Sequence, residues 1–458
     1  MVEWTKNHVL RNALTFTGAI IATLSAVLFL IVFLAELFGW HTNPYLGILF
    51  FLILPSLFVF GLLLIPVGVW LERRRLRRGE PGSAFRWPRL DLEDPTQRRA
   101  TAIFILMTLA NIIIVSLATY RGVEYMDSVS FCGQVCHTVM KPEFTAYQDG
   151  PHSRVTCVQC HIGPGASWFA RSKLSGTRQV FAVTFRTFSR PIPSPVENLR
   201  PARDTCEQCH WPEKFHGDKI QRIYDYAEDE KNSESVTTLQ VHVGGGSERL
   251  GIATGIHWHM NVANEVEYIA TDDKRQVIPY VRLKDKAGNV REYVAEGVTP
   301  DQLAKGERRR MDCMDCHNRP SHPMAPSAEK AVNSLLAGGE IPKTLPYVRR
   351  EAVKALKAAY PTQDAADEGI SRALRDFYRT QYQQVYMTRR QDVEKAVTST
   401  QNVYRRNVFP EMNVQFGTYP NNIGHMDFPG CFRCHDDNHK TKDGRKISQD
   451  CDACHHIE

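Results

Sequence analysis

Long apolar runs mark the first quarter of this 458-residue chain. They extend over Leu14–Phe38, Tyr45–Trp70 and Ala100–Tyr120, and residues 14–70 contain a single charged side chain, Glu36. A helix of about 20 apolar residues is long enough to cross a hydrocarbon core roughly 30 Å thick. The pattern therefore predicts three transmembrane helices within residues 14–120. Buried helices of a soluble protein are the alternative, but they rarely run this far without a charge.

The rest of the chain alternates between two other patterns. Residues 213–305 contain short β-type runs (VEYIA, VIPYVRL, NVREYVAE) and predict a β-rich insert. Within it, Leu239–Asn261 reads as a β-hairpin interrupted by three consecutive glycines. Residues 327–405 show helical periodicity instead, ending in one long run from Asp367 to Arg406. Its apolar residues predict one buried face, made of Phe377, Tyr378, Tyr382, Tyr386 and Met387.

Charge gives the chain a direction across the membrane. The segment 71–99 holds nine arginines, whereas 39–44 holds neither lysine nor arginine. Because basic loops stay in the cytoplasm, we expect residues 1–13 and the arginine-rich loop 71–99 to be cytoplasmic and everything after Tyr120 to lie outside. The protein is then a multi-pass protein of a bacterial inner membrane with a periplasmic domain. Residues 1–100 carry +4 of the net charge of +6, so no basic face for nucleic acid is indicated.

The twelve cysteines form six pairs, and a histidine follows the second cysteine of every pair. C-x-x-C-H is the attachment signature of c-type haem, in which two thiols bond the porphyrin and the histidine binds the iron. The first pair has three intervening residues instead of two. We number the motifs 1 to 6; they are Cys132, Cys136, His137; Cys157, Cys160, His161; Cys206, Cys209, His210; Cys313, Cys316, His317; Cys431, Cys434, His435; and Cys451, Cys454, His455.

The same cysteines admit two other interpretations. Zinc sites use paired Cys-x-x-Cys, but they would leave the following histidine unexplained and favour four-ligand groupings. Disulfides within the pairs would leave the same histidine without a role. The sequence therefore predicts six covalently bound haem c groups.

Each iron of this kind takes a second axial ligand. After the six motif histidines, ten of the remaining eleven lie outside the cytoplasmic N-terminus, which is enough for every iron. We expect ligands first among the histidines close to the motifs, and next among those of the predicted hairpin. The first group is His152, His322, His425 and His439; the second is His242, His257 and His259, of which the last two would share one face of a strand.

Residues 100–212 and 313–323 resemble the NapC/NrfH/NirT family of membrane-anchored quinol dehydrogenases. The resemblance rests on one apolar span leading into FCGQVCHTVM, then HSRVTCVQCHIGPG, and later CMDCHNRPSH. It implies that a methionine just after the first motif can bind the first iron in place of the histidine, so Met140 and His137 are both candidates, and that His322 binds a neighbouring haem. It also implies a quinol pocket near Lys173. The acidic partner that the family places after this lysine is missing, since residues 162–196 contain no Asp or Glu.

The expected fold is therefore a membrane-anchored multihaem cytochrome c with three transmembrane helices and a mainly α periplasmic haem domain. The chain is expected to divide into seven segments. They are the cytoplasmic N-terminus 1–13; the three transmembrane helices with their arginine-rich loop, 14–120; 121–212 with haems 1–3; the β-rich insert 213–305; 306–326 with haem 4; the helical segment 327–424; and 425–458 with the last two haems.

The expected function is electron transfer from a membrane quinol such as menaquinol, through six haems, to a periplasmic redox protein or to membrane-complex subunits. Lys173 and the intramembrane Glu36 are the candidate quinol-site residues. Arg178–Arg190, with three phenylalanines, is a candidate interfacial helix beside them, although core packing fits it equally well. Two other functions remain open. One is that of a conduit subunit without a quinone site, and the other is that of a multihaem reductase with an open catalytic iron.

Overall fold

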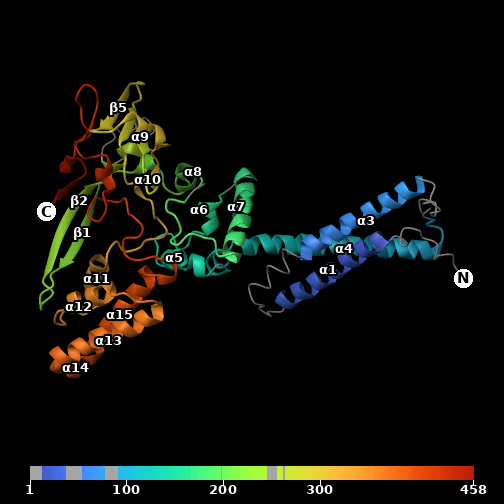
Figure 1. Ribbon diagram of the computed structural model, residues 1–458, viewed down its shortest axis with the longest axis horizontal. Coiled ribbons are helices and arrows are strands. Elements are labelled where there is room, and N and C mark those ends of the chain that lie inside the picture. The colour runs from blue at the N-terminus through green and yellow to red at the C-terminus, as the bar shows by residue number, and fades with distance from the viewer. Residues whose placement is uncertain are drawn as a thin grey trace. The chain divides into compact units, whose positions relative to one another are not determined.

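The computed structural model describes residues 13–37, 54–77, 91–135, 137–163, 166–196, 199–244, 255–260 and 264–458. The chain forms two compact units that divide between Val135 and Cys136, and each is described separately (Figure 1). The first unit contains helices α1 (Ala13–Leu37), α3 (Leu54–Arg77) and α4 (Pro95–Met126), followed by the π-turn η4 (Phe131–Val135). All three helices are long and apolar enough to cross a membrane.

Helices α1 and α3 pack against each other through small residues. A Cβ atom added to Gly18 would lie 2.7 Å from the carbonyl oxygen of Gly61, and one added to Gly61 would lie 2.7 Å from the backbone nitrogen of Ala22. Such close approach of two backbones is how helices associate inside a membrane, where lipid and side chain are equally apolar. Helix α4 begins at Pro95 behind the N-cap Asp94, which accepts a hydrogen bond from the Thr96 backbone.

A leucine in place of Gly18 is expected to force α1 and α3 apart. Overpacking of this kind costs about 1–3 kcal/mol, so thermal unfolding of the detergent-solubilised protein should begin at a lower temperature. Gly122→Leu on α4 is the matched control, because a Cβ there meets no atom within 4 Å. Equal unfolding temperatures for both variants would contradict the close packing of α1 on α3.

The second unit begins with short helices and then two antiparallel sheets. The helices are α5 (His137–Gln148), α6 (Cys157–His161), α7 (Ala166–Thr184), α8 (Ala202–Cys206), η5 (Pro212–Lys214), η6 (Ile256–Met260), α9 (Pro300–Lys305) and α10 (Cys313–Cys316). The strands are β1 (Asp218–Tyr226), β2 (Glu234–His242), β3 (Glu265–Ala270), β4 (Tyr280–Lys284), β5 (Val290–Ala295), β6 (Glu307–Arg310), β7 (His439–Lys440) and β8 (His455–Ile457).

Both sheets include a strand from the C-terminal segment. The strand orders are β1-β2-β8 and β6-β3-β4-β5-β7. In the first sheet His455 pairs with Val241 and Ile457 with Leu239. In the second, His439 pairs with Ala295. The last residues of the chain are therefore fixed to strands that lie 144 positions earlier, for His439 and Ala295, and 214 positions earlier, for His455 and Val241, which positions motifs 5 and 6.

A helical segment follows motif 4. It consists of α11 (Ala328–Ala337), α12 (Val348–Lys357), α13 (Gln363–Gln381), α14 (Gln383–Thr388) and α15 (Arg390–Asn407). The 3-10 turns η7 (Pro410–Met412), η8 (Gly430–Arg433) and η9 (Cys451–Ala453) complete the chain. Apolar side chains from α11, α12, α13 and α15 form the largest core, with Ile370, Leu374 and Val393 fully buried.

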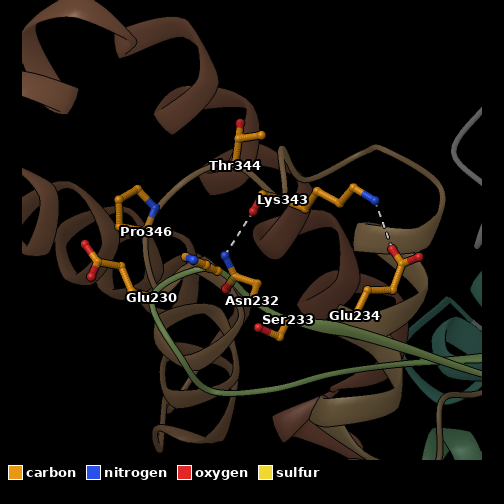
Figure 2. A pocket seen from close by; sticks show the side chains of 8 residues that line it. Glu230, Asn232, Ser233, Glu234, Lys343, Thr344 and Pro346 are labelled. Carbon is orange, nitrogen blue, oxygen red and sulfur yellow. Dashed lines mark hydrogen bonds and ion pairs between the residues drawn. The ribbon is translucent and has the colours of Figure 1, made fainter.

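The tip of the β1–β2 hairpin docks on this helical segment. Asn232, at a φ of 49° and 2% exposed, donates from Nδ2 to the carbonyls of Lys343 (3.0 Å) and Leu345 (2.8 Å). Its Oδ1 accepts from the Arg349 backbone at 2.9 Å. Figure 2 shows the hollow beside this contact, with Lys343 paired to Glu234 at 2.9 Å. The polar walls of the hollow thus bond one another and anchor the hairpin.

Two expectations about local structure are wrong. Residues Leu239–Asn261 do not form a hairpin, because β2 ends at His242 and pairs with the preceding β1, while Ile256–Met260 forms the 3-10 turn η6. The run Asp367–Arg406 is not one helix either. It breaks at Tyr382 and Arg389, so that α13 and α15 fold onto the same core. Met387, predicted on the buried face, is 74% exposed.

Candidate haem sites

The motif cysteines and histidines lie on short helical turns. In motifs 3 and 4 the backbone N–H of the histidine donates to the carbonyl of the first cysteine at 2.8 Å, and in motif 5 at 3.1 Å. One turn therefore brings residues i, i+3 and i+4 to the same side, which places both thiols and the imidazole around a single ligand. Motif 1 has one more residue between its cysteines, and Cys132 lies in the wider turn η4. Cys136 and the side chain of His137 lie outside the described residues.

Every motif histidine from 2 to 6 has its ring beside the ring of a second histidine that lies outside the motifs. Four of these five partners lie 58 to 176 positions along the chain from the motif histidine that they face, whereas His425 lies 30 positions before His455. The ring centroids are 6.3 Å apart for His161 and His322, 6.1 Å for His210 and His152, 6.3 Å for His317 and His257, 5.8 Å for His435 and His259, and 6.1 Å for His455 and His425. Two imidazoles that bind one metal from opposite sides, each nitrogen about 2 Å from it, have centroids about 6 Å apart. The spacing fits an iron with two histidine ligands.

Hydrogen bonds fix which nitrogen of the partner histidines faces inward. The Nδ1 atoms of His152, His322, His257 and His259 each donate to a backbone carbonyl: those of Pro320 (3.0 Å), Glu143 (2.9 Å), Val243 (2.9 Å) and Ile256 (3.0 Å). Because a carbonyl only accepts, the proton is on Nδ1 and the lone pair is on Nε2. Metal-binding histidines almost always donate their other ring N–H to an oxygen atom in this way.

Burial favours the neutral rings that a metal requires. It lowers the pKa of His161, and the adjacent His322 lowers it further. The same cause lowers the pKa of His317, next to His257, and of His259, next to His435. A neutral imidazole retains the lone pair that binds iron, so these sites are prepared for coordination.

Neighbouring motifs lie side by side in sequence order from 2 to 6. Burial raises the pKa of the Cys160 thiol in motif 2, and Cys209 of motif 3 raises it further. Cys206 of motif 3 hydrogen-bonds Cys313 of motif 4. Burial and then Cys431 of motif 5 raise the pKa of Cys316 to about 12. Burial and then Cys431 also raise the pKa of Cys454 in motif 6. The five sites therefore form a continuous row.

Two histidines expected as ligands make other contacts. The buried His439 donates from Nε2 to the Ile278 carbonyl at 2.6 Å, and its Nδ1 lies 2.8 Å from Asp436 Oδ1. Neither nitrogen is directed toward a motif, so the expectation for His439 is not met. His242 bonds Asp218 through Nδ1 at 2.9 Å, and its ring lies 4.8 Å from that of His456, which is too close for an iron between them.

We expect His439→Ala to lower stability without changing the iron sites. Removing the ring leaves the buried Ile278 carbonyl unpaired, which costs about 1–3 kcal/mol of the free energy of unfolding. The measurements are the denaturant midpoint and the low-temperature spectrum of the oxidised protein. A change in the number of low-spin centres would instead return His439 to the set of ligands.

The remaining predicted residues are placed as follows. Lys173 is half-buried on α7; Leu174 and Phe181 on the same helix are 74% and 59% exposed, and Phe185, directly after its end, is 69% exposed. Met140 is half-buried on α5. Glu36 lies on α1, but its side chain lies outside the described residues.

Sequence reasoning missed the pair of Glu143 and Arg319. The side chain of Arg319 donates to Glu143 Oε2 at 2.8 Å and to the His322 carbonyl at 2.9 Å, and both members of the pair are largely buried. Together with the bond from His322 to the Glu143 carbonyl, it holds the ring of His322 in place. The two partners are 176 positions apart, and no local pattern marks either of them.

Comparisons with known proteins identify the chain as a c-type cytochrome. Residues 94–192 match the model of the NapC/NirT cytochrome c family, N-terminal region. The chain is 41% identical, over 448 residues, to the cytochrome c-type protein ImcH of Geobacter sulfurreducens, which covers 97% of this chain and 88% of that protein. No solved structure matches. Covalently bound haem and membrane-associated electron transfer follow from these similarities. The chain belongs to the NapC/NirT family of membrane-anchored c-type cytochromes.

Proposed function

We propose that the protein transfers electrons from a membrane quinol, through six covalently bound haem c groups, to a redox partner on the periplasmic side. The observation that carries the proposal is the row of five histidine pairs from motif 2 to motif 6. Motif 1, which precedes this row, begins six residues after α4 ends, so the motifs start close to the membrane in the sequence.

The residues of the chain have distinct tasks in this function. Bound haem supplies reversible one-electron exchange without a proton. The cysteines would fix its position, and the paired histidines would hold the iron in one coordination state. The Nδ1–carbonyl bonds of four partner histidines keep their rings from turning, which would limit reorganisation when the charge changes; they are those of His152, His257, His259 and His322. With two histidines available at each of motifs 2 to 6, these sites would favour electron transfer over an open catalytic iron.

Quinol oxidation also requires groups that accept protons. We place the quinol site at α7, where Lys173 lies next to the exposed Leu174 and one face presents Phe181 and Phe185, whose rings stack 6.4 Å apart. Exposed apolar residues among arginines are typical of a helix at a membrane interface. Glu36 remains a second candidate for the proton acceptor.

Two parts of this proposal come from the sequence. The arginine-rich loop between α3 and α4 favours the cytoplasm, which places the second unit in the periplasm and the three spans in the inner membrane. Menaquinol is the candidate donor. Motifs 5 and 6 form the other end of the row and face a periplasmic redox protein or subunits of a membrane complex.

The test uses the purified full-length protein in lipid nanodiscs. Addition of a reduced short-chain menaquinol analogue under anaerobic conditions should reduce the haems, as followed by their visible absorption. Reduction by dithionite then gives the total absorption change of all reducible haems. Haems that respond to dithionite but not to the quinol would reject the quinol site and favour the conduit subunit. Nitrite turnover by the same preparation would instead favour the reductase.

A further inference from the structure

Motifs 4 and 5 are joined by a buried arginine. Arg433 lies between the cysteines of motif 5 and is 9% exposed. Its Nη2 donates at 2.6 Å to the carbonyl of Asp315, which lies between the cysteines of motif 4, while its Nε donates to Gly430 at 2.8 Å. Asn422 donates to the same Asp315 carbonyl at 2.9 Å. The two motifs are therefore held in a fixed arrangement.

One short turn faces both of these motifs. His257 and His259 lie two residues apart on η6, yet His257 pairs with His317 of motif 4 and His259 with His435 of motif 5. The turn is itself held in place. Its Trp258 backbone N–H donates to Gly255 at 3.0 Å, and the Trp258 carbonyl accepts from Asn264 at 3.2 Å. A movement of η6 would alter both pairs together.

The two pairs differ in ring orientation. The planes of His257 and His317 are nearly parallel, at 7°, whereas those of His259 and His435 are nearly perpendicular, at 83°. Parallel imidazoles donate π-electrons into the same iron d orbital and split the d levels. Perpendicular imidazoles divide that donation between two orbitals, which leaves them close in energy and stabilises iron(III) less. With the same ligand type, the perpendicular site is the easier one to reduce.

We infer that η6 holds motifs 4 and 5 as a pair of unlike iron sites, with motif 5 reduced at the higher potential. This inference rests on the proposed function, since it requires iron between these rings. The difference favours the passage of one electron, without a proton, from motif 4 to motif 5. It also gives each site a spectroscopic signature: a rhombic low-spin signal for parallel rings and a highly anisotropic low-spin signal for perpendicular rings.

The other pairs define what the whole spectrum should contain. The interplanar angle is 77° at motif 3 and 22° at motif 6, with an intermediate 51° at motif 2. Electron paramagnetic resonance of the oxidised full-length protein should therefore show both signal classes. A wild-type spectrum with rhombic signals alone would overturn the inference, whatever the variants do.

Variants assign the signals. His259→Met should remove one highly anisotropic signal and His257→Met one rhombic signal, with six haems still attached by mass. In a potentiometric titration, the signal lost in His259→Met should be the one that disappears at the higher potential in the wild type. His216→Met, at an exposed histidine whose Nδ1 donates to Lys214, is the control and should change neither class.

The opposite assignment or the reverse order of potentials would overturn the inference. The proposed function is judged separately, by quinol-driven reduction of the wild-type protein. If quinol reduces the wild-type protein but its spectrum lacks the highly anisotropic class, the proposed function stands and the inference is wrong.

Discussion

Replacement of His322 by glycine is expected to interrupt the row of sites at motif 2. The variant removes the ring paired with His161 at 6.3 Å and leaves a cavity of the size of an imidazole. One low-spin centre should become high-spin. Quinol-driven reduction of the haems beyond motif 2 should slow by at least about tenfold, since replacing residues that only hydrogen-bond a metal's ligands already lowers affinity or activity by about 10–100-fold.

Added imidazole provides the internal control for this variant. It should enter the cavity, restore the low-spin signal and recover most of the rate. The control variant His216→Gly, at an exposed histidine, should keep the wild-type low-spin signal and rate, with or without added imidazole. A low-spin signal that persists in His322→Gly without imidazole would show that His322 is not the ligand.

Replacement of Lys173 by alanine is expected to slow quinol oxidation with little effect on the haem sites. Lys173 lies on α7 between the α6 motif and the exposed phenylalanines, and its ammonium group would bind the quinol oxygen. Loss of one charged hydrogen bond costs about 1.5–3 kcal/mol, which corresponds to a rate lower by roughly 10–100-fold.

The comparison with dithionite separates the two roles of Lys173. Reduction by dithionite and haem content should match the wild type, and Lys173→Arg should retain part of the quinol rate. Equal slowing with quinol and dithionite would mean that Lys173 supports the fold around motif 2 and has no part in quinol binding.

Features that depend on local sequence could be predicted well. The three apolar runs correspond to α1, α3 and α4, because span length and apolarity are set within one segment. The spacing of the motif cysteines and histidines can be read directly from the sequence. The family resemblance, based on those motifs, is confirmed by the comparisons.

Features that depend on partners distant in the sequence could not be predicted. His257 and His259 were expected on a strand, since the sequence does not reveal that β2 pairs with β1 and leaves residues 256–260 to form a turn. His439 was expected as a ligand from its nearness to motif 5 in sequence. The Ile278 carbonyl that engages it lies 161 positions earlier. Similarly, the break at Tyr382 follows from a shared core that periodicity alone does not show.

Intact-mass spectrometry of the purified full-length protein tests whether six haems are bonded to the twelve motif cysteines. We expect the polypeptide mass plus six haems, and one haem fewer when both cysteines of a single motif are replaced by alanine. A mass equal to the polypeptide alone, or a number of haems that does not change in those variants, would show that the motifs do not attach haem.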